Sequence, residues 1–463
     1  MFSMTFDELA RVVGGRPLAG SPDHVFTGVV TDSRKVTPGC LFVPLKGEHV
    51  DGHQYIAQAI ARGAVGALTE RTDVEGQGGC LVLVSNALAA LHDMARHHLA
   101  VTGVKVIGIT GSVGKTTTKD MIAAVLGQRY RVLKSEGNLN TEVGLPLTIF
   151  NLEDNHEIAV LEMGMRGPGE IAELCRIAKP DVAVLTNISE VHLELLGSIE
   201  NIALAKAEIL EALGESGIAV LNADDPWVMK MRSKARGTVI TYGIANSADT
   251  MAYEIETLGL GGSRFTVDLD GERMGRVHLP VPGEHNILNA LAAVSVGRAL
   301  GMSFEQVNAG LASFTPSAQR LNIINLSDGS ILINDSYNAG PKSVAATLGV
   351  LREIRGDRPT IAVLGDMLEL GEAAERAHLT VGALVHSTGV DRLITRGQLA
   401  RRIAKGALEA GMAPERIRAA ISNRDALSAL LDWLQPGSAI LIKGSRGMAM
   451  EEIVEGLLDH LRQ

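Results

Sequence analysis

A lysine and a run of threonines follow a glycine-rich turn in the stretch KVIGITGSVGKTTTKDM, residues 105–121. KVIGIT has the pattern of a buried strand and TTTKDMIAAVLG that of a helix, so the glycines lie at a strand-to-helix turn. Backbone amides from Gly111 to Lys115 can point inward there, and the helix N-terminus adds positive potential. The pattern favours a phosphate-binding loop, with Lys115 on the β and γ phosphates of a nucleotide and Thr116 on a magnesium ion.

This loop departs from the usual ATPase template, G-x-x-x-x-G-K-[ST]. Ile109 occupies the position five residues before Gly114, where the template requires glycine. The competing interpretation is a glycine-rich turn capped by threonine, which a strand, loop and helix in register disfavour. We therefore predict a subfamily of nucleotide enzymes with a shorter loop. The predicted nucleotide-binding residues of the loop are Thr110, Gly111, Ser112, Val113, Gly114, Lys115, Thr116 and Thr117.

Two further polar side chains follow later strand-like runs. AVLEMGMRG places Glu162 at the end of one run, and TNISEVHLELLGS places His192 after the next. Open parallel sheets assemble their sites at the carboxyl ends of strands, so both residues are candidate magnesium ligands or water-mediated neighbours of the ion. The alternatives are an acid that faces solvent at a strand end and a structural histidine.

Two helical segments supply the remaining candidates. NIALAKAEILEAL places Lys206 in an otherwise apolar helix, where the alternative is a lysine that extends its amine to solvent. GEHNILNALAAVSVGRAL places Asn286 and Asn289 three residues apart on one helix face, where their amides could recognise adenine. Helix capping is the alternative for Asn286, and a surface position is the alternative for Asn289.

The composition sets the broad class of the protein. The chain has 463 residues, of which 46% are hydrophobic and 21% charged, so several domains are expected. The net charge of −10 argues against general nucleic-acid binding, although a local cationic pocket can still bind small anions. We expect no membrane span, because no apolar run of about eighteen residues occurs. Three scattered cysteines fit a reducing cytoplasm, and the expected assembly state is a monomer.

The chain divides into three predicted α/β domains, with boundaries at residues 1–85, 86–314 and 315–463. The first begins with a helix at Thr5, which has capping-box spacing to Glu8, and continues with short mixed strands. In the second, strand-like runs alternate with helical ones, which predicts a central parallel sheet with crossover helices around the phosphate loop. In the third the alternation restarts, which predicts a dinucleotide-fold-like domain.

Several motifs occur in an order that resembles the Mur ligases, ATP-dependent enzymes that build the peptide of bacterial peptidoglycan. The motifs are TGSVGKTTT, EMG, VH, the lysine of AKAEI, GEHNILNALAA, SAQRL and NDSYNAGP. The resemblance covers nearly the whole chain and accounts for the short loop, because that family uses G-[ST]-x-G-K-T. Folylpolyglutamate synthetases share this core. The N-terminal stretch TDSRKVTPGCLFVPLKGEHVDGH is similar to the UDP-sugar-binding domain of the Mur ligases that add the third and later residues, a domain that folylpolyglutamate synthetases lack.

Within the family, EGNLNTEVGLPLTI and LGDMLELG resemble the branch that adds D-alanyl-D-alanine to UDP-N-acetylmuramoyl-tripeptide. The D-N-P-R signature of the preceding ligase is absent. NAGP stands where the branch has Asn-Ala-Asn-Pro, so Gly340 raises a question about that turn. The resemblance implies that the uridine diphosphate is held by Ser33, Arg34, Lys46 and Gly47, and the peptide by Asn138, Asn140 and Thr141. Without it, Arg34 and Lys46 would be two exposed bases beside a turn.

The reaction that the resemblance implies is amide formation through an acyl phosphate. One magnesium ion would be bound by Thr116 and Glu162, and a second by His192 and a carbamylated Lys206. Arg320, Asp335 and Tyr337 would reach ATP from the C-terminal domain, so closure of that domain would complete the site. Two other functions are weighed: a related ligase with a different amino acid or a folate acceptor, and a switch protein that hydrolyses ATP to change shape.

Overall fold

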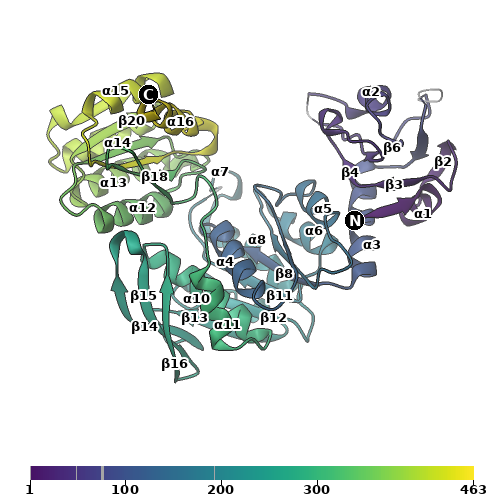
Figure 1. Ribbon diagram of the computed structural model, residues 1–463, viewed down its shortest axis with the longest axis horizontal. Coiled ribbons are helices and arrows are strands. Elements are labelled where there is room, and N and C mark those ends of the chain that lie inside the picture. Colours follow the sequence, from purple (N-terminus) through teal and green to yellow (C-terminus); the bar gives the residue numbers. More distant parts are fainter. Residues whose placement is uncertain (1, 48, 74–77, 192, 463) are drawn as a thin grey trace.

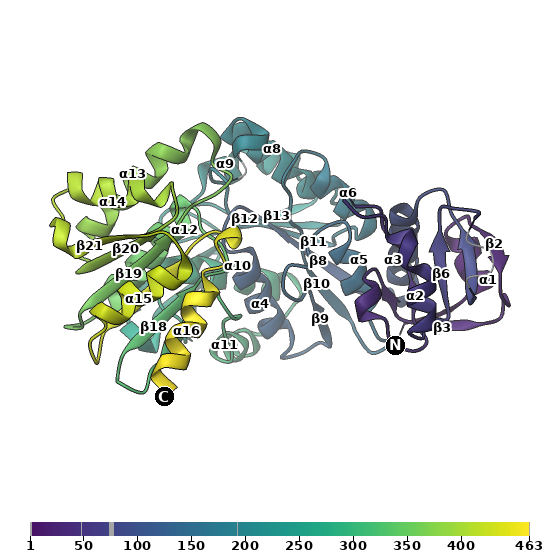
Figure 2. The same ribbon diagram turned by 90° about the horizontal axis from the view of Figure 1, so that it is seen from above.

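The computed structural model describes residues 2–47, 49–73, 78–191 and 193–462, and they form three α/β domains. The N-terminal and C-terminal domains lie at opposite ends of the molecule, with the central domain between them (Figures 1 and 2). Within the described ranges, no helix combines the length and the apolar character needed to cross a membrane. The predicted three-domain α/β architecture is confirmed.

The N-terminal domain contains a two-stranded and a five-stranded sheet. In the larger sheet the order is β2-β7-β6-β5-β4, and only β2 runs antiparallel to its neighbour. The predicted first helix begins where Thr5 accepts a hydrogen bond from the Glu8 amide at 3.1 Å. The elements are β1 (Ser3–Thr5), α1 (Phe6–Val12), β2 (Arg16–Ala19), β3 (Val25–Thr27), β4 (Val29–Val30), η1 (Ser33–Lys35), β5 (Leu41–Phe42), η2 (Gly52–Tyr55), α2 (Ile56–Ala61), β6 (Gly66–Thr69) and β7 (Cys80–Leu83).

Helix α3 (Ala87–Thr102) connects the first two domains and contacts helices of both. Asn86 caps its start by accepting a hydrogen bond from the Ala89 amide at 2.7 Å. The ring of Phe2 packs at this junction against Phe26 and against Phe150 of the central domain, with centroids 5.9 and 4.8 Å away. One hydrophobic cluster therefore extends through both domains.

The central sheet has nine strands in the order β16-β15-β14-β13-β12-β11-β8-β10-β9. Strands β8 to β14 pair in parallel, as the alternating sequence predicts, whereas β14 to β16 pair antiparallel. The antiparallel extension was not predicted, because one face of β16 is largely exposed and its sequence lacks a continuous apolar run. The strands are β8 (Lys105–Thr110), β9 (Val132–Lys134), β10 (Ile158–Glu162), β11 (Val182–Leu185), β12 (Ile218–Asn222), β13 (Thr238–Gly243), β14 (Thr250–Thr257), β15 (Ser263–Leu269) and β16 (Glu272–Leu279).

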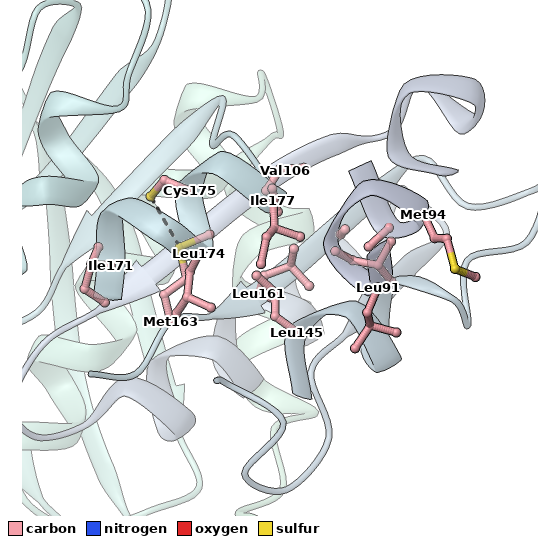
Figure 3. Close-up of a cluster of buried hydrophobic side chains, with 14 of the residues drawn as sticks. Leu91, Met94, Val106, Leu145, Leu161, Met163, Ile171, Leu174, Cys175 and Ile177 are labelled. Carbon is pink, nitrogen blue, oxygen red and sulfur yellow. Dashed lines mark hydrogen bonds between the residues drawn. The ribbon is translucent and has the colours of Figure 1, made fainter. Parts of the chain in front are cut away.

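Helices cover both faces of this sheet, so the central domain has three layers. The helices are α4 (Lys115–Leu126), α5 (Gly144–Ile149), α6 (Glu170–Ile177), α7 (Leu193–Leu196), α8 (Ile199–Glu211), α9 (Pro226–Lys230), η3 (Arg232–Lys234), η4 (Gly259–Gly261), α10 (Glu284–Ala299) and α11 (Phe304–Ala312). Helices α4, α10 and α11 share one core cluster with the sheet, and α5, α6 and α8 share the other. Figure 3 shows part of the second cluster, where Leu91 of α3 and Leu145 of α5 lie near Leu161 of β10.

The C-terminal domain is a six-stranded sheet in the order β17-β18-β22-β19-β20-β21, parallel except for β17. Helices α12, α13 and α14 pack on one face, and α15 and α16 on the other (Figure 2). The elements are β17 (Asn322–Asn325), β18 (Ile331–Asp335), α12 (Pro341–Ile354), β19 (Thr360–Gly365), η5 (Gly371–Ala373), α13 (Ala374–Ser387), β20 (Arg392–Arg396), α14 (Ala400–Glu409), η6 (Pro414–Arg416), β21 (Ile417–Ala420), α15 (Asn423–Trp433), β22 (Ala439–Lys443), η7 (Arg446–Met448) and α16 (Glu451–Arg462).

The segment between α11 and β17 joins the central and C-terminal domains. It contains two non-glycine residues with left-handed backbone, Gln319 at φ 63° and Leu321 at φ 47°. Ser317 donates a hydrogen bond to Asp120 of α4, and the Leu321 amide donates one to Asp335 of β18 at 3.1 Å. A strained segment anchored to one element of each domain has the character of a hinge.

Candidate active site

The predicted phosphate loop connects the end of β8 to the start of α4. Gly111 and Gly114 have φ angles of 153° and 81°, which side chains other than glycine adopt rarely. A Cβ at Gly111 would lie 2.0 Å from the Thr186 hydroxyl, and one at Gly114 would lie 2.8 Å from the Asn289 amide oxygen. Both glycines are therefore required by conformation and by space. Lys115 begins α4, and its amine donates a hydrogen bond to the Gly111 carbonyl at 2.8 Å.

The segment after β11 holds the loop in place. The Asn187 side chain accepts a hydrogen bond from the Val113 amide at 2.9 Å and donates one to the Val113 carbonyl at 2.8 Å. Thr186 donates to the same carbonyl, and Ser189 exchanges hydrogen bonds with the Ser112 hydroxyl. Thr186 and Asn187 were not predicted as site residues. Their position directly after a buried strand was the available signal.

Glu162 lies beside the loop at the end of β10 and is only 2% exposed. It accepts hydrogen bonds from the Thr116 hydroxyl at 2.7 Å and from the Asn140 side chain at 2.8 Å. Its own amide donates to the Ser135 hydroxyl at 3.1 Å. The alternative of a solvent-facing acid is therefore wrong. The hydroxyl and carboxylate oxygens in contact are the ligand types that Mg²⁺ prefers.

Lys206 of α8 reaches the same loop. It is 1% exposed, and its amine donates a hydrogen bond to the Gly111 carbonyl at 3.1 Å, so a solvent-exposed lysine is ruled out. Burial, with a smaller contribution from Lys115, holds the pKa of Lys206 well below its ordinary value. Burial also lowers the pKa of Lys115, against an opposing effect of Glu162. Two buried amines thus converge on one carbonyl.

Asn286 and Asn289 lie near the start of α10, packed against the loop and α4. Asn289 accepts a hydrogen bond from Thr118 at 3.1 Å and donates one to Asn286 at 3.2 Å. Asn286 donates to the Pro282 carbonyl at 2.7 Å. Both are buried, so the surface interpretation of Asn289 is wrong. Their contact with adenine stays a prediction.

Several polar side chains of the C-terminal domain lie near the segment that joins it to the central domain. The Arg320 guanidinium lies over the Tyr337 ring, 4.1 Å from its centroid. Asp335 forms an ion pair with the buried Lys443 and accepts a hydrogen bond from Thr347 at 2.7 Å. Lys443 was not predicted, although it is the last residue of β22.

The histidine of the GEHN motif lies where the central and C-terminal domains meet. Burial lowers the pKa of His285 to about 4, while Asp335 acts to raise it and Lys443 to lower it. The half-buried His285 thus lies close to the Asp335–Lys443 ion pair of the C-terminal domain. His192, the other histidine of the motifs, lies outside the described residues.

The predicted residues for the uridine diphosphate lie in the N-terminal domain. Ser33 is buried and donates to Gln58, whereas Arg34 is 82% exposed and forms a two-point ion pair with Asp32. Lys46 and Gly47 are exposed, and Lys46 forms an isolated β-bridge with Asp51. This geometry is compatible with a pyrophosphate site and with two exposed bases alike, so the role stays a prediction. Asn138 and Thr141, predicted to contact the peptide, are exposed beside Asn140.

Gly340, which departs from the family motif, has an extended backbone at φ −149° and precedes the first residue of α12. Its amide donates to the Ser343 hydroxyl at 3.0 Å, which accounts for the helix start without an asparagine. Its backbone therefore does not require glycine, and the turn forms normally. A cavity of about 260 Å³ lies here between the phosphate loop, the segment after β11 and the start of α12.

Known proteins are similar to this chain along nearly its whole length. Three family models match: "Mur ligase family, catalytic domain" over residues 25–110, "Mur ligase middle domain" over 109–297 and "Mur ligase, glutamate ligase domain" over 319–446. Proteins named UDP-N-acetylmuramoyl-tripeptide--D-alanyl-D-alanine ligase are similar along their full length. Those of Bacillus subtilis and Escherichia coli are 39% and 36% identical to this chain, with 99% of both chains covered in each case.

Solved structures agree. A crystal structure of MurF from Acinetobacter baumannii matches with a TM-score of 0.91 at 30% identity and covers 99% of both chains. MurF ligase from Thermotoga maritima in complex with ADP matches with a TM-score of 0.83 at 30% identity, over 94% of this chain and 98% of that one. The chain belongs to the Mur ligase family, in the branch of the UDP-N-acetylmuramoyl-tripeptide--D-alanyl-D-alanine ligases.

Proposed function

We propose that this chain is an ATP-dependent amide ligase that joins D-alanyl-D-alanine to UDP-N-acetylmuramoyl-tripeptide during synthesis of the peptidoglycan precursor in the cytoplasm. The observation that carries the proposal is the convergence of Lys115 and Lys206 on a glycine loop beside the Thr116–Glu162 pair. Full-length similarity to ligases of that name supplies the two substrates. The similar ADP complex supports ATP as the third.

The proposed reaction has two steps. The terminal carboxylate of the tripeptide attacks the γ-phosphate of ATP, which gives an acyl phosphate and ADP. The amine of D-alanyl-D-alanine then attacks the acyl carbon, the amide bond forms, and inorganic phosphate leaves. Both steps bring anions together, so the main tasks of the protein are positioning and charge neutralisation. Lys115 and the loop amides perform them at the phosphates.

Magnesium fits the donor set at Thr116 and Glu162, since both offer oxygen atoms next to the loop. When bound, the ion would neutralise charge on the phosphates. Asn140 would keep the Glu162 carboxylate oriented through its 2.8 Å hydrogen bond. Among the described residues, no group of three or more histidine, cysteine, aspartate or glutamate side chains surrounds this position.

We further propose that Lys206 becomes carbamylated. Carbamate formation requires a neutral amine, and burial beside Lys115 favours that form by lowering the pKa of Lys206. The modification would convert the Lys206 amine into an anion that, with His192, would bind a second ion. Asn286, Asn289, Arg320, Asp335 and Tyr337 would then bind the rest of ATP.

The proposed division of labour follows the three domains. Residues 1–85 would bind the UDP-sugar through Ser33, Arg34, Lys46 and Gly47, and residues 86–314 would bind ATP. Residues 315–463 would complete the site on closure. Asn138 and Thr141, exposed beside the site residue Asn140, would contact the peptide.

An ADP-release assay tests the function. ADP should form with UDP-N-acetylmuramoyl-tripeptide and D-alanyl-D-alanine together, and release should nearly stop when the dipeptide is omitted. Equal release without the dipeptide would instead indicate a nucleotide switch. A panel with folate and single amino acids as alternative substrates separates related ligases.

The same assay tests the phosphate loop. We expect Lys115→Ala to reduce turnover at least about a hundredfold, which is the scale of losing one preorganised stabiliser of transition-state charge. The variant should still fold, because the Lys115 amine donates to the loop carbonyls of Gly111 and Ser112, and its loss removes its repulsion with Lys206. Near-normal turnover of this variant would exclude the loop from catalysis.

A further inference from the structure

The cavity at the domain boundary has a lining that no step above explains. Its volume of about 260 Å³ is below the roughly 300–1,000 Å³ of pockets that hold drug-sized ligands. It is therefore suited to a small molecule rather than to a nucleotide or a UDP-sugar. Residues of two domains line it: Ser189, Glu190 and Val191 follow β11 of the central domain, and Gly340, Pro341 and Lys342 lie at the start of α12 of the C-terminal domain.

The lining combines one charge of each sign with apolar surface. Glu190 and Lys342 are its only charged residues among those described, and they come from different domains. The side chains of Val191, Ile199 and Pro341 supply the apolar part. A ligand that satisfies this lining has an ammonium group, a carboxylate and small apolar side chains between or beside them.

The cavity also adjoins the reacting groups. Val113 of the phosphate loop forms part of its wall, and Ser189, another wall residue, donates its amide to Ser112 of the loop at 2.9 Å. A molecule in the cavity therefore lies next to the place where the loop binds the transferred phosphate. This location suits the substrate that attacks the activated carboxylate.

We propose that this cavity binds the incoming D-alanyl-D-alanine, with Lys342 on its terminal carboxylate and Glu190 on its ammonium group. The apolar side chains contact the two methyl groups. The assignment rests on the proposed function and adds the residues that select a free dipeptide. Gly340 borders the cavity, and a Cβ there would lie 3.6 Å from Val191, an ordinary contact.

Lys342 is available for this role because its side chain is largely exposed and its one close hydrogen bond leaves donors free. Its side chain is 62% exposed, and its amine lies 3.1 Å from the Ile188 carbonyl and 3.9 Å from Asp225. Asp225 is itself occupied by the amides of Ile188, Trp227 and Val228. An ammonium group has three donors, so a substrate carboxylate can be added without loss of the carbonyl contact.

The same contacts give Lys342 a second effect. Ile188 lies between Asn187 and Ser189, which hold the phosphate loop, so Lys342 also ties the C-terminal domain to the loop. If Lys342 only connects the two domains, its loss affects substrates with and without a carboxylate alike. If it binds the substrate carboxylate, its loss affects only the substrate that has one. The experiment therefore compares D-alanyl-D-alanine with its C-terminal amide.

In the coupled assay, we expect the wild-type protein to show a KM for the dipeptide about tenfold lower than for its amide, the scale of one charge-assisted hydrogen bond. Lys342→Met should remove this preference, and Lys342→Arg should keep most of it. Glu190→Gln should raise KM for both acceptors alike, because both carry the ammonium group. Lys405→Met, which changes an exposed lysine of α14 paired with Glu409, is the matched control and should behave as wild type.

Two results would overturn the assignment. In one, Lys342→Met keeps the wild-type preference for the acid over the amide. In the other, it slows both acceptors equally, which would limit Lys342 to domain docking. Wild-type protein that ligates neither acceptor would contradict the proposed function instead. Thermal unfolding of each variant confirms that a lost preference does not come from a lost fold.

Discussion

Lys115 and Lys206 place two buried amines against the carbonyl of Gly111. Two ammonium groups at this separation from one atom repel each other strongly when little water surrounds them. The direction of the pKa shifts agrees, since burial lowers the pKa of both. Such a pair is costly for folding, so its presence at a glycine loop is evidence for a functional role.

The first residue-scale prediction concerns Lys206. We expect Lys206→Ala to lose at least about a hundredfold in turnover, because the anionic group proposed there disappears. Formate or acetate should partly restore activity by occupying the vacated space. Lys206→Arg should not be restored, since its cation fills that space. Initial rates with and without added carboxylate measure the effect, and normal turnover of Lys206→Ala would disprove the carbamate.

A second residue-scale prediction uses His285, whose pKa is lowered to about 4 by burial. Between its ordinary pKa of about 6.5 and about 4, the unfolded chain binds a proton that the folded chain excludes. The stability attributable to this residue is therefore complete above about pH 6.5 and is lost as the pH falls toward 4. The charge of Asp335 raises the pKa of His285 and the charge of Lys443 lowers it further, so both neighbours affect the pH dependence.

Replacing His285 by glutamine should therefore flatten the acid side of the stability curve. Between about pH 7 and pH 5, wild-type protein should lose roughly 1–2 kcal/mol more than His285→Gln, because a tenfold change in proton affinity corresponds to about 1.4 kcal/mol. Urea unfolding at several pH values measures this difference. His386→Gln, at an exposed histidine of α13, should follow the wild-type curve. Parallel curves for wild type and His285→Gln would contradict the prediction.

For single site residues, the position relative to strand-like runs of the sequence was a better predictor than the residue type. Glu162 could be predicted because it ends a buried strand-like run, and strand ends of a parallel sheet meet at one edge. Lys206 in a helix gave no such signal, and only the resemblance to a family singled it out. Lys443 and Asn187 were missed because their partners, Asp335 and Val113, are far away in sequence.

At the scale of elements, the segment after β11 acts as a support for the phosphate loop. Asn187 satisfies both the amide and the carbonyl of Val113, so the loop does not depend on its own glycines alone for its shape. This kind of support keeps binding groups in place before the ligand arrives. A loop that loses it must be ordered by the nucleotide, which reduces affinity.

We therefore expect Asn187→Ala to raise KM for ATP about tenfold, since the partly buried Val113 amide would lose its acceptor, and an unpaired amide costs roughly 1–3 kcal/mol. KM for the UDP-linked substrate should change less. Asn151→Ala is a suitable control, because Asn151 also donates to a backbone carbonyl but lies exposed just after α5. If both variants bind ATP as well as wild type, the segment is not required for loop geometry.

The sequence predicted the central parallel strands of the sheet better than its edge strands. The buried parallel strands β8 and β10 to β13 have continuous apolar runs that predict them directly. The edge strands β15 and β16 expose part of one face, and their pairing depends on hairpin contacts that no short run encodes. The sequence therefore predicted the part of the sheet that supports the site and missed the part farthest from it.

At the scale of the whole molecule, the two domain junctions differ in chemistry. One hydrophobic cluster spans the N-terminal and central domains, with Phe2 against Phe150. Among the described residues, no hydrophobic cluster spans the central and C-terminal domains. Their junction instead contains single polar contacts, such as those of Ser317 with Asp120 and Lys342 with Ile188. Polar junctions of this kind permit relative motion more readily than apolar ones.

The last prediction is that substrates close the molecule by moving the C-terminal domain. In the proposed binding mode, ATP would bridge the loop and the Asp335 region, and the UDP-linked substrate would bridge the N-terminal and central domains. Each ligand would therefore connect only two of the three domains that Figure 1 shows. Both together should compact the protein more than either alone. Small-angle scattering of the free, singly bound and doubly bound protein measures this directly. The strained residues Gln319 and Leu321 place the pivot between α11 and β17. Identical scattering profiles in all four states would show that the reaction proceeds without closure.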